Sequence, residues 1–170
     1  MKSITTIFLG LLFTISAMSQ SIDDIQFINH PYFNGNAIEK VKAKMKSIIR
    51  GLGYGGANVF FEIQGEKSKT RISQSDSLYF MINMEQGMFG SMSLFNAEQK
   101  GKKRIVMYAK SRVFSASDIG GESIQYNTIK VYENIYKIIP SEPLHPGEYS
   151  FIFYGSTSGM SADAFTFGID

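Results

Sequence analysis

The chain has 170 residues, no cysteine and a formal net charge of +2 at pH 7. Without cysteine it cannot form disulfides or carry a lipidated cysteine anchor, and so small a net charge gives no general reason to expect nucleic acid or an acidic partner. A chain of this length is typical of one domain whose core buries enough surface to be stable without cross-links.

The first 19 residues have the pattern of a secretory signal peptide. Lys2 supplies a positive charge, residues 4–15 form an apolar run, and residues 17–19 read small-x-small. The run is too short for a membrane-spanning helix, which needs about 20 residues. We therefore expect cleavage after this triplet, a single mature domain over residues 20–170, and a secreted or periplasmic protein without a membrane anchor.

The mature chain has the sequence pattern of an all-β protein. From residue 57 onward, short apolar runs rich in Phe, Tyr, Ile and Val are separated by Gly, Ser, Asn and Asp. We expect strands at residues 25–29, 58–64, 69–72, 78–84, 92–98, 104–110, 123–129, 135–139, 149–154 and 164–169. Turn residues predict hairpins at GEKS, residues 65–68, and at QKGKK, residues 99–103, where Gly101 can adopt a positive φ.

The segment IEKVKAKMKSII, residues 38–49, fits two structures. Lys40, Lys42, Lys44 and Lys46 alternate with apolar or small residues, which is the period of a strand with all four ammonium groups on one face. The apolar positions also fit a helical stripe. We favour the strand because a helix would scatter the lysines around its circumference, but both structures are compatible with the sequence.

The stretch GLGYGG, residues 51–56, has the G-x-G-x-x-G spacing of a dinucleotide-binding loop. Such a loop binds pyrophosphate only where a strand leads into it and a helix follows, because the helix N-terminus supplies the amide donors. The next residues, ANVFFEIQ, predict a strand. We therefore expect a turn or bulge between two strands, and no nucleotide or other cofactor.

The segment LHPGEY, residues 144–149, has the pattern of a tyrosine corner. In immunoglobulin-like and fibronectin-like sandwiches such a segment crosses between the sheets, and its tyrosine hydroxyl bonds to backbone a few residues upstream. Leu144, Gly147 and Tyr149 occupy the corresponding positions. The sequence therefore predicts an immunoglobulin-like antiparallel β-sandwich, with an ordinary turn before a strand as the alternative.

Three groups of residues carry a resemblance to other sequences. They are the glycine stretch at residues 53–56, the set Gly65, Ser68, Arg71 and Ile72, and the C-terminal patterns L-x-P-G-E-Y-x-F at 144–151 and F-x-F-G-I-D at 165–170. In these motifs the chain resembles a group of exported bacterial proteins of unknown function. The resemblance covers most of the mature chain and supports the predicted fold, but it implies no activity and no functional residues.

The basic cluster Lys40, Lys42, Lys44, Lys46 and Arg50 is the candidate binding site. Alternate residues on one face of a strand lie about 6 to 7 Å apart. A row of ammonium groups with this spacing suits an anionic glycan or a lipopolysaccharide phosphate. Lysines also protect edge strands from unwanted pairing, so a purely structural explanation competes with binding.

The sequence offers little material for catalysis. It has two histidines, His30 and His145, and none of the common catalytic motifs. A glycosidase needs two carboxylates about 5 to 10 Å apart, and the available acids are Glu62, Asp76, Glu122 and Glu148. Strand alternation predicts that Glu62 and Glu148 face solvent, and nothing identifies a pair.

Four methionines, at positions 81, 84, 88 and 92, lie close together in the sequence. Thioethers bind copper(I), but methionine more often fills gaps in a core. We expect an exported, non-catalytic binding module for an envelope protein or a glycan, without nucleic-acid binding. The alternatives are a carboxylate-dependent hydrolase acting on a polysaccharide and, third, methionine-based metal handling.

Overall fold

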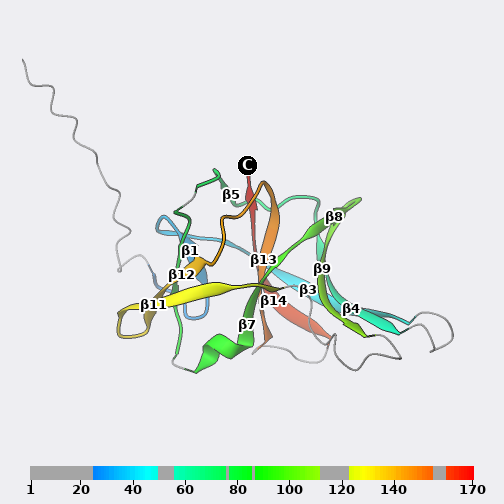
Figure 1. The fold of residues 1–170 in the computed structure, drawn as a ribbon, viewed down its shortest axis with the longest axis horizontal. Helices are drawn as coiled ribbons and strands as arrows, with labels where there is room; N and C mark the ends of the chain where they lie inside the picture. The colour runs from blue at the N-terminus through cyan, green and yellow to red at the C-terminus, as the bar shows by residue number, and fades with distance from the viewer. Residues whose placement is uncertain (1–24, 50–55, 76, 86, 112–122, 155–159) are drawn as a thin grey trace, which may run out of the picture.

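The computed structural model describes residues 25–49, 56–75, 77–85, 87–111, 123–154 and 160–170 (Figure 1). The predicted signal peptide, Arg50, Asp76, Glu122 and most of the glycine stretch lie outside these ranges. The described chain forms two packed β-sheets and almost no helix, which confirms the predicted all-β sandwich. No helix in these ranges has the length and apolar character needed to span a membrane.

The two sheets differ in size. The smaller sheet contains, in spatial order, β11 (Tyr126–Tyr132), β12 (Ile135–Pro140), β6 (Phe80–Asn83), β1 (Pro31–Phe33) and β2 (Asn36–Ala37). The larger contains β10 (Ser123–Ile124), β7 (Met92–Asn96), β13 (Gly147–Phe153), β14 (Ser161–Ile169), β3 (Glu39–Ile49), β4 (Ala57–Gln64), β9 (Lys103–Ser111) and β8 (Glu98–Lys100), with β5 (Arg71–Ile72) beside β14. A 3-10 turn, η3 (Met88–Ser91), precedes β7.

The larger sheet curls into a half-barrel because one stretch of chain pairs at both ends of it. β7 pairs with β13, and after Ala97 the chain continues into β8, which pairs with β9. The N–H of Ala97 itself donates to the carbonyl oxygen of Glu148, 2.8 Å away. The curled sheet therefore has an inner face and an outer face.

Strands β13 and β14 are buried on both faces and lie in the middle of the molecule (Figure 1). Phe151, Phe165 and Phe167 pack against the smaller sheet in the larger hydrophobic core. On the opposite face, Ile152 and Ala164 pack inside the curl, in a second core. Alternate residues of a strand point to opposite faces, so one pair of strands forms the wall between two cores.

The strand predicted for residues 38–49 is confirmed as β3. Its lysines are exposed, whereas Val41, Ala43 and Met45 pack into the core inside the curl. β3 has β14 on one side and β4 on the other. The alternative explanation of the lysine row, protection of an edge strand, is therefore wrong.

The glycine stretch connects two paired strands. Ile49, the last residue of β3, is opposite Ala57, the first residue of β4, and Gly56 has a φ of 84°. A dinucleotide-binding loop would need a helix at this place. Strand β4 follows the glycine stretch instead. The predicted connection between two strands is therefore confirmed by β3 before it and β4 after it.

The hairpin predicted at GEKS, residues 65–68, is wrong. β4 pairs with β3 and β9, whereas β5 pairs in parallel with β14. The strand predicted at residues 25–29 is reduced to one bridge between Ile28 and Asn83, and the short strands β1 and β2 were not predicted. The second predicted hairpin is confirmed, since β8 and β9 flank Gly101, which has a φ of 62°.

The segment between β12 and β13 crosses from the smaller sheet to the larger. The Tyr149 hydroxyl donates a hydrogen bond to the carbonyl oxygen of His145, 2.7 Å away. Leu144 is buried in the core between the sheets, and Gly147 begins β13. The sheets contain five and nine strands, unlike the seven-stranded immunoglobulin arrangement, so an immunoglobulin-like topology is not confirmed.

Substituting Tyr149→Phe removes this hydrogen bond while keeping the buried ring. We expect the free energy of unfolding to fall by about 1 kcal/mol, the usual net value of such a bond. Denaturant titration measures the change, and Tyr132→Phe, at an exposed tyrosine, is the matched control. Equal stability of the two variants would show that the corner bond contributes nothing.

Candidate binding surface

The predicted lysine row belongs to a continuous outer face formed by β3, β4 and β9. Strand register places Lys44 opposite Glu62 and Lys46 opposite Phe60. Across the next ladder, Glu62 is opposite Ile105 and Phe60 is opposite Met107. These residues all point away from the curl, because their neighbours along each strand pack inside it.

Two carboxylates fix most of this row. Asp163 forms ion pairs with Lys40 and Lys42, at 3.0 and 2.5 Å. Glu62 forms ion pairs with Lys46 and Lys103, at 3.0 and 2.5 Å. Glu62 is only 6% exposed, so the prediction that it faces solvent is wrong. It lies on the outer face, but its neighbours cover it.

The outer face has an excess of positive charge. Together with Asp163 of the neighbouring β14, it contains six lysines, at positions 40, 42, 44, 46, 103 and 110, and two carboxylates, Glu62 and Asp163, which leaves four positive charges. On the adjoining β8, Glu98 and Lys100 pair with each other and add no net charge. The whole chain has a net charge of +2, so the remainder is net negative. Lys44 and Lys110 are exposed, and neither has an ion-pair partner within the described chain.

An apolar strip and a small cavity adjoin these charges. Phe60, Ile105 and Met107 lie between the lysines of β3 and the edge of β9. Beyond them β9 separates from β7, leaving a cavity of about 220 Å³. Its lining consists of Phe95, Asn96, Glu98, Ile105, Met107 and Lys110. The outer face therefore offers ammonium groups, apolar contacts and amide or carboxylate hydrogen-bonding groups within one continuous surface.

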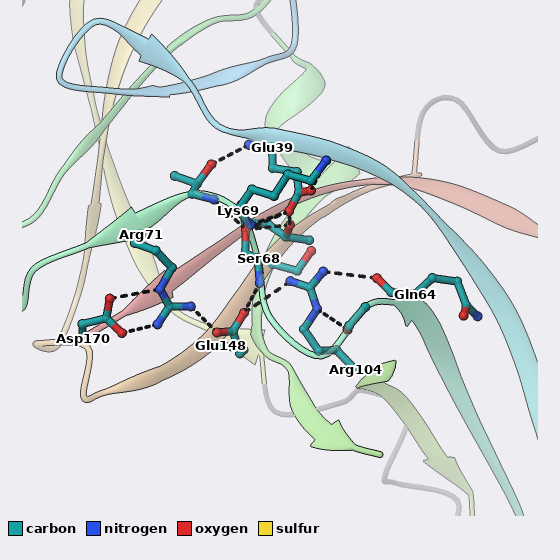
Figure 2. A network of polar contacts seen from close by, with 12 residues as sticks. Glu39, Gln64, Ser68, Lys69, Arg71, Arg104, Glu148 and Asp170 are labelled. Carbon is teal, nitrogen blue, oxygen red and sulfur yellow. Dashed lines mark hydrogen bonds and ion pairs between the residues drawn. The ribbon is translucent and has the colours of Figure 1, made fainter. Parts of the chain in front are cut away.

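A network of polar groups joins the loop before β5 to strands β13, β14 and β9 (Figure 2). The Glu148 carboxylate accepts hydrogen bonds from the backbone N–H of Ser68 at 2.7 Å, from Nη1 of Arg104 at 3.3 Å and from Nη1 of Arg71. Arg104 is 1% exposed and also donates to the carbonyl oxygens of Gly65 and Gln64. Burial lowers the pKa of Arg104, although the Glu148 carboxylate opposes this effect.

Arg71 links the network to the C-terminal segment. Its Nε and Nη2 atoms donate to the two carboxylate oxygens of Asp170. The guanidinium lies directly over Gly168, where an added Cβ would be 1.8 Å from Nη1 of Arg71. Glycine at this position therefore allows the arginine to lie flat against β14.

A second carboxylate stabilises the loop before β5. Glu39 accepts hydrogen bonds from the backbone N–H of Lys69 at 2.9 Å and from the hydroxyls of Ser68 and Thr166, each at 3.0 Å. Burial alone would raise the pKa of Glu39, but these hydrogen bonds outweigh it and lower the pKa. The Ser68 Oγ also lies 2.7 Å from the carbonyl oxygen of Thr166, so its single proton is shared between this oxygen and the Glu39 carboxylate. These groups satisfy one another, so the network holds the fold together.

Six residues of the motifs that carry the sequence resemblance meet in this network. They are Gly65, Ser68, Arg71, Glu148, Gly168 and Asp170. Sequence reasoning predicted that Glu148 faces solvent, which is wrong, and it missed Glu39 and Arg104. The sequence did contain a signal for Arg104: strand alternation places it on the same face of β9 as Val106, which points into the curl.

The remaining candidates from the sequence do not form a second site. Glu62 lies on the outer face and Glu148 on the inner face, so these two carboxylates do not face each other. Met84 and Met92 are buried in the core between the sheets, whereas Met81 packs in a separate cluster on the other side of the smaller sheet. Among the described residues, no group of three or more His, Cys, Asp or Glu could hold a metal ion.

Comparison with protein-family models, with curated proteins and with solved structures finds no match for this chain.

The ion pairs of Glu62 predict a dependence of stability on pH. Hydrogen bonds from Lys103 and Lys46 lower the pKa of Glu62 below its usual 4.5. A group whose pKa is lower in the folded state stabilises the fold above its unfolded pKa and loses that effect as the pH falls. We therefore expect the free energy of unfolding to decrease below about pH 4.5, and less steeply in Glu62→Gln than in the parent. Denaturant titrations across this range test it, with Glu66→Gln as the exposed control.

The buried pair of Glu148 and Arg104 predicts a large effect of removing one partner. Glu148→Ala leaves the Arg104 guanidinium buried without its counterion, and we expect a loss of about 3–5 kcal/mol in unfolding free energy. Glu98→Ala, which removes an exposed ion pair with Lys100, should cost no more than about 1 kcal/mol. Adding Arg104→Met to Glu148→Ala should recover part of the loss. A Glu148→Ala variant as stable as Glu98→Ala would contradict the assignment of this network to structure.

Proposed function

We propose that the protein is an exported, non-catalytic binding module that recognises an anionic glycan through the outer face of β3, β4 and β9. The single observation that carries this proposal is the excess of four positive charges on one face of a chain whose total charge is +2. Such a face attracts polyanions and concentrates them near the surface. Export follows from the predicted signal peptide.

An extended ligand suits this face better than a compact one. Lysines on alternate residues of β3 form a row with a spacing of about 6 to 7 Å. Asp163 and Glu62 hold four of the six ammonium groups in position, while Lys44 and Lys110 are available to a ligand. Phe60 and Met107 lie between them and can contact the apolar faces of sugar rings. This combination favours an acidic polysaccharide over a small anion.

The positions of the acidic side chains support binding without catalysis. A glycosidase needs one carboxylic acid that donates a proton and a second carboxylate about 5 to 10 Å away. Glu62 is hydrogen-bonded by two lysines and Glu148 by two arginines, and the two acids lie on opposite faces of the larger sheet. Neither is arranged to donate a proton to a bound sugar.

The proposal is tested by binding of the mature chain to polygalacturonate, an acidic polysaccharide used as a probe. We expect binding that weakens as salt rises from low to physiological concentration, because exposed charges are screened. Lys44→Gln/Lys110→Gln should weaken binding several-fold. This variant keeps all the ion pairs of the face, so its folding should be unchanged. Isothermal titration calorimetry at two salt concentrations provides the measurement.

The matched control is Lys67→Gln/Lys102→Gln, which removes the same charge from exposed positions that belong to none of β3, β4, β9 and β11. We expect it to bind like the parent. Equal weakening by the two double variants, equal binding to a neutral polysaccharide such as dextran, or binding insensitive to salt would each count against the proposed surface.

A further inference from the structure

Strand β11 is a long, open edge of the smaller sheet. Among the described strands it pairs only with β12. Tyr126, its first residue, is partly buried, and the six residues after it are exposed. The opposite edge, β2, has only two residues. Unpaired N–H and C=O groups along an exposed edge strand are a template for pairing with another strand.

Exposed apolar side chains gather on the same sheet. Of the eight large hydrophobic side chains that are exposed in the described chain, five belong to β11 or to the segment before β1. They are Phe27, Ile28, Ile129, Val131 and Tyr132. Ile28 bridges to Asn83, which is opposite Ile135 of β12. Ile135 is in turn opposite Tyr132, so Ile28 and Tyr132 belong to one row across the sheet. A cluster of this kind marks an interaction surface.

We infer that β11 pairs with β11 of a second copy of this chain, antiparallel and about a twofold axis at Thr128. Hydrogen-bonded and non-hydrogen-bonded residue pairs alternate along an antiparallel ladder. A twofold axis that passed between two neighbouring pairs would exchange them, so both would have to be hydrogen-bonded or both non-hydrogen-bonded. The alternation along the ladder forbids this. The axis can therefore pass only through a pair formed by one residue and its own copy.

Regular geometry and charge select Thr128 as the centre. The ladder between β11 and β12 is regular from Tyr126 to Lys130 and shifts register after Lys130, so the regular run is centred on Thr128. An axis at Lys130 would place two ammonium groups directly opposite each other, which destabilises a ladder. An axis at Thr128 places Lys130 opposite Tyr126 and Ile129 opposite Asn127, and no like charges meet.

The same register brings the apolar side chains of the two copies together. With Thr128 at the centre, the two Ile129 residues are diagonal neighbours on one face, a separation that large side chains span. The two five-stranded sheets then form one continuous sheet of two copies. The lysine surface belongs to the other sheet, so both copies keep it exposed.

The chain has no cysteine, which permits a register-specific test. Directly opposite residues of an antiparallel ladder have Cα atoms about 4.5–5.5 Å apart, within the range that a disulfide bridges. Thr128→Cys should therefore form a disulfide-linked dimer under mild oxidation. Ile129→Cys and Lys130→Cys should not, because the two copies of Ile129 are diagonal neighbours about 7–8 Å apart and those of Lys130 are farther apart, beyond the usual reach of a disulfide.

Sedimentation velocity on the cysteine-free mature chain measures the association itself. We expect a dimer fraction that grows with concentration and that Ile129→Lys reduces, because this change places two added ammonium groups next to Lys130 at the centre of the pairing. Met160→Lys adds the same charge at an exposed residue just before β14, in the other sheet, and should leave the dimer unchanged.

A monomer at every concentration would overturn the proposal, as would oxidation that links Ile129→Cys or Lys130→Cys more efficiently than Thr128→Cys. The proposed glycan binding is measured separately, on a different sheet, so each proposal can fail without the other.

Discussion

The ladder between β13 and β14 joins the two hydrophobic cores, because its side chains pack against the smaller sheet on one face and fill the curl on the other. Neither strand has a solvent-facing side. Phe151 and Phe167 pack in the core between the sheets, whereas Ala162 and Ala164 pack in the core inside the curl. The same strand alternation therefore serves both cores.

Where these two strands leave the apolar cores, their polar residues are still shielded from water and need partners within the protein. Glu148 of β13 and Thr166 of β14 are on the face that points into the curl. Each accepts hydrogen bonds from the loop before β5 or from β9. A buried carboxylate is tolerated when cations and N–H donors satisfy it. This requirement explains why Arg104 is inside the curl and why β5 is held beside β14.

On the outer face, the buried carboxylates have a different effect. Glu62 and Asp163 each accept two lysines, which orders four ammonium groups without neutralising the whole face. The charge that remains is available to a polyanion. If two copies pair through β11, each presents such a face, and a long polysaccharide could contact both, which raises the overall affinity without any new contact.

The sequence by itself determined the β class and the turn at Gly101, and it favoured the strand at residues 38–49 and the crossing before Tyr149 over their alternatives. Each depends on local periodicity or on the backbone preferences of a few adjacent residues. Only the tertiary structure decided that β5 pairs with β14, that β3 is a central strand, and that Glu62 and Glu148 are buried. Alternation assigns a residue to one of two faces, but what covers that face depends on segments distant in the chain: Lys103 reaches Glu62 across 41 positions and Arg71 reaches Glu148 across 77.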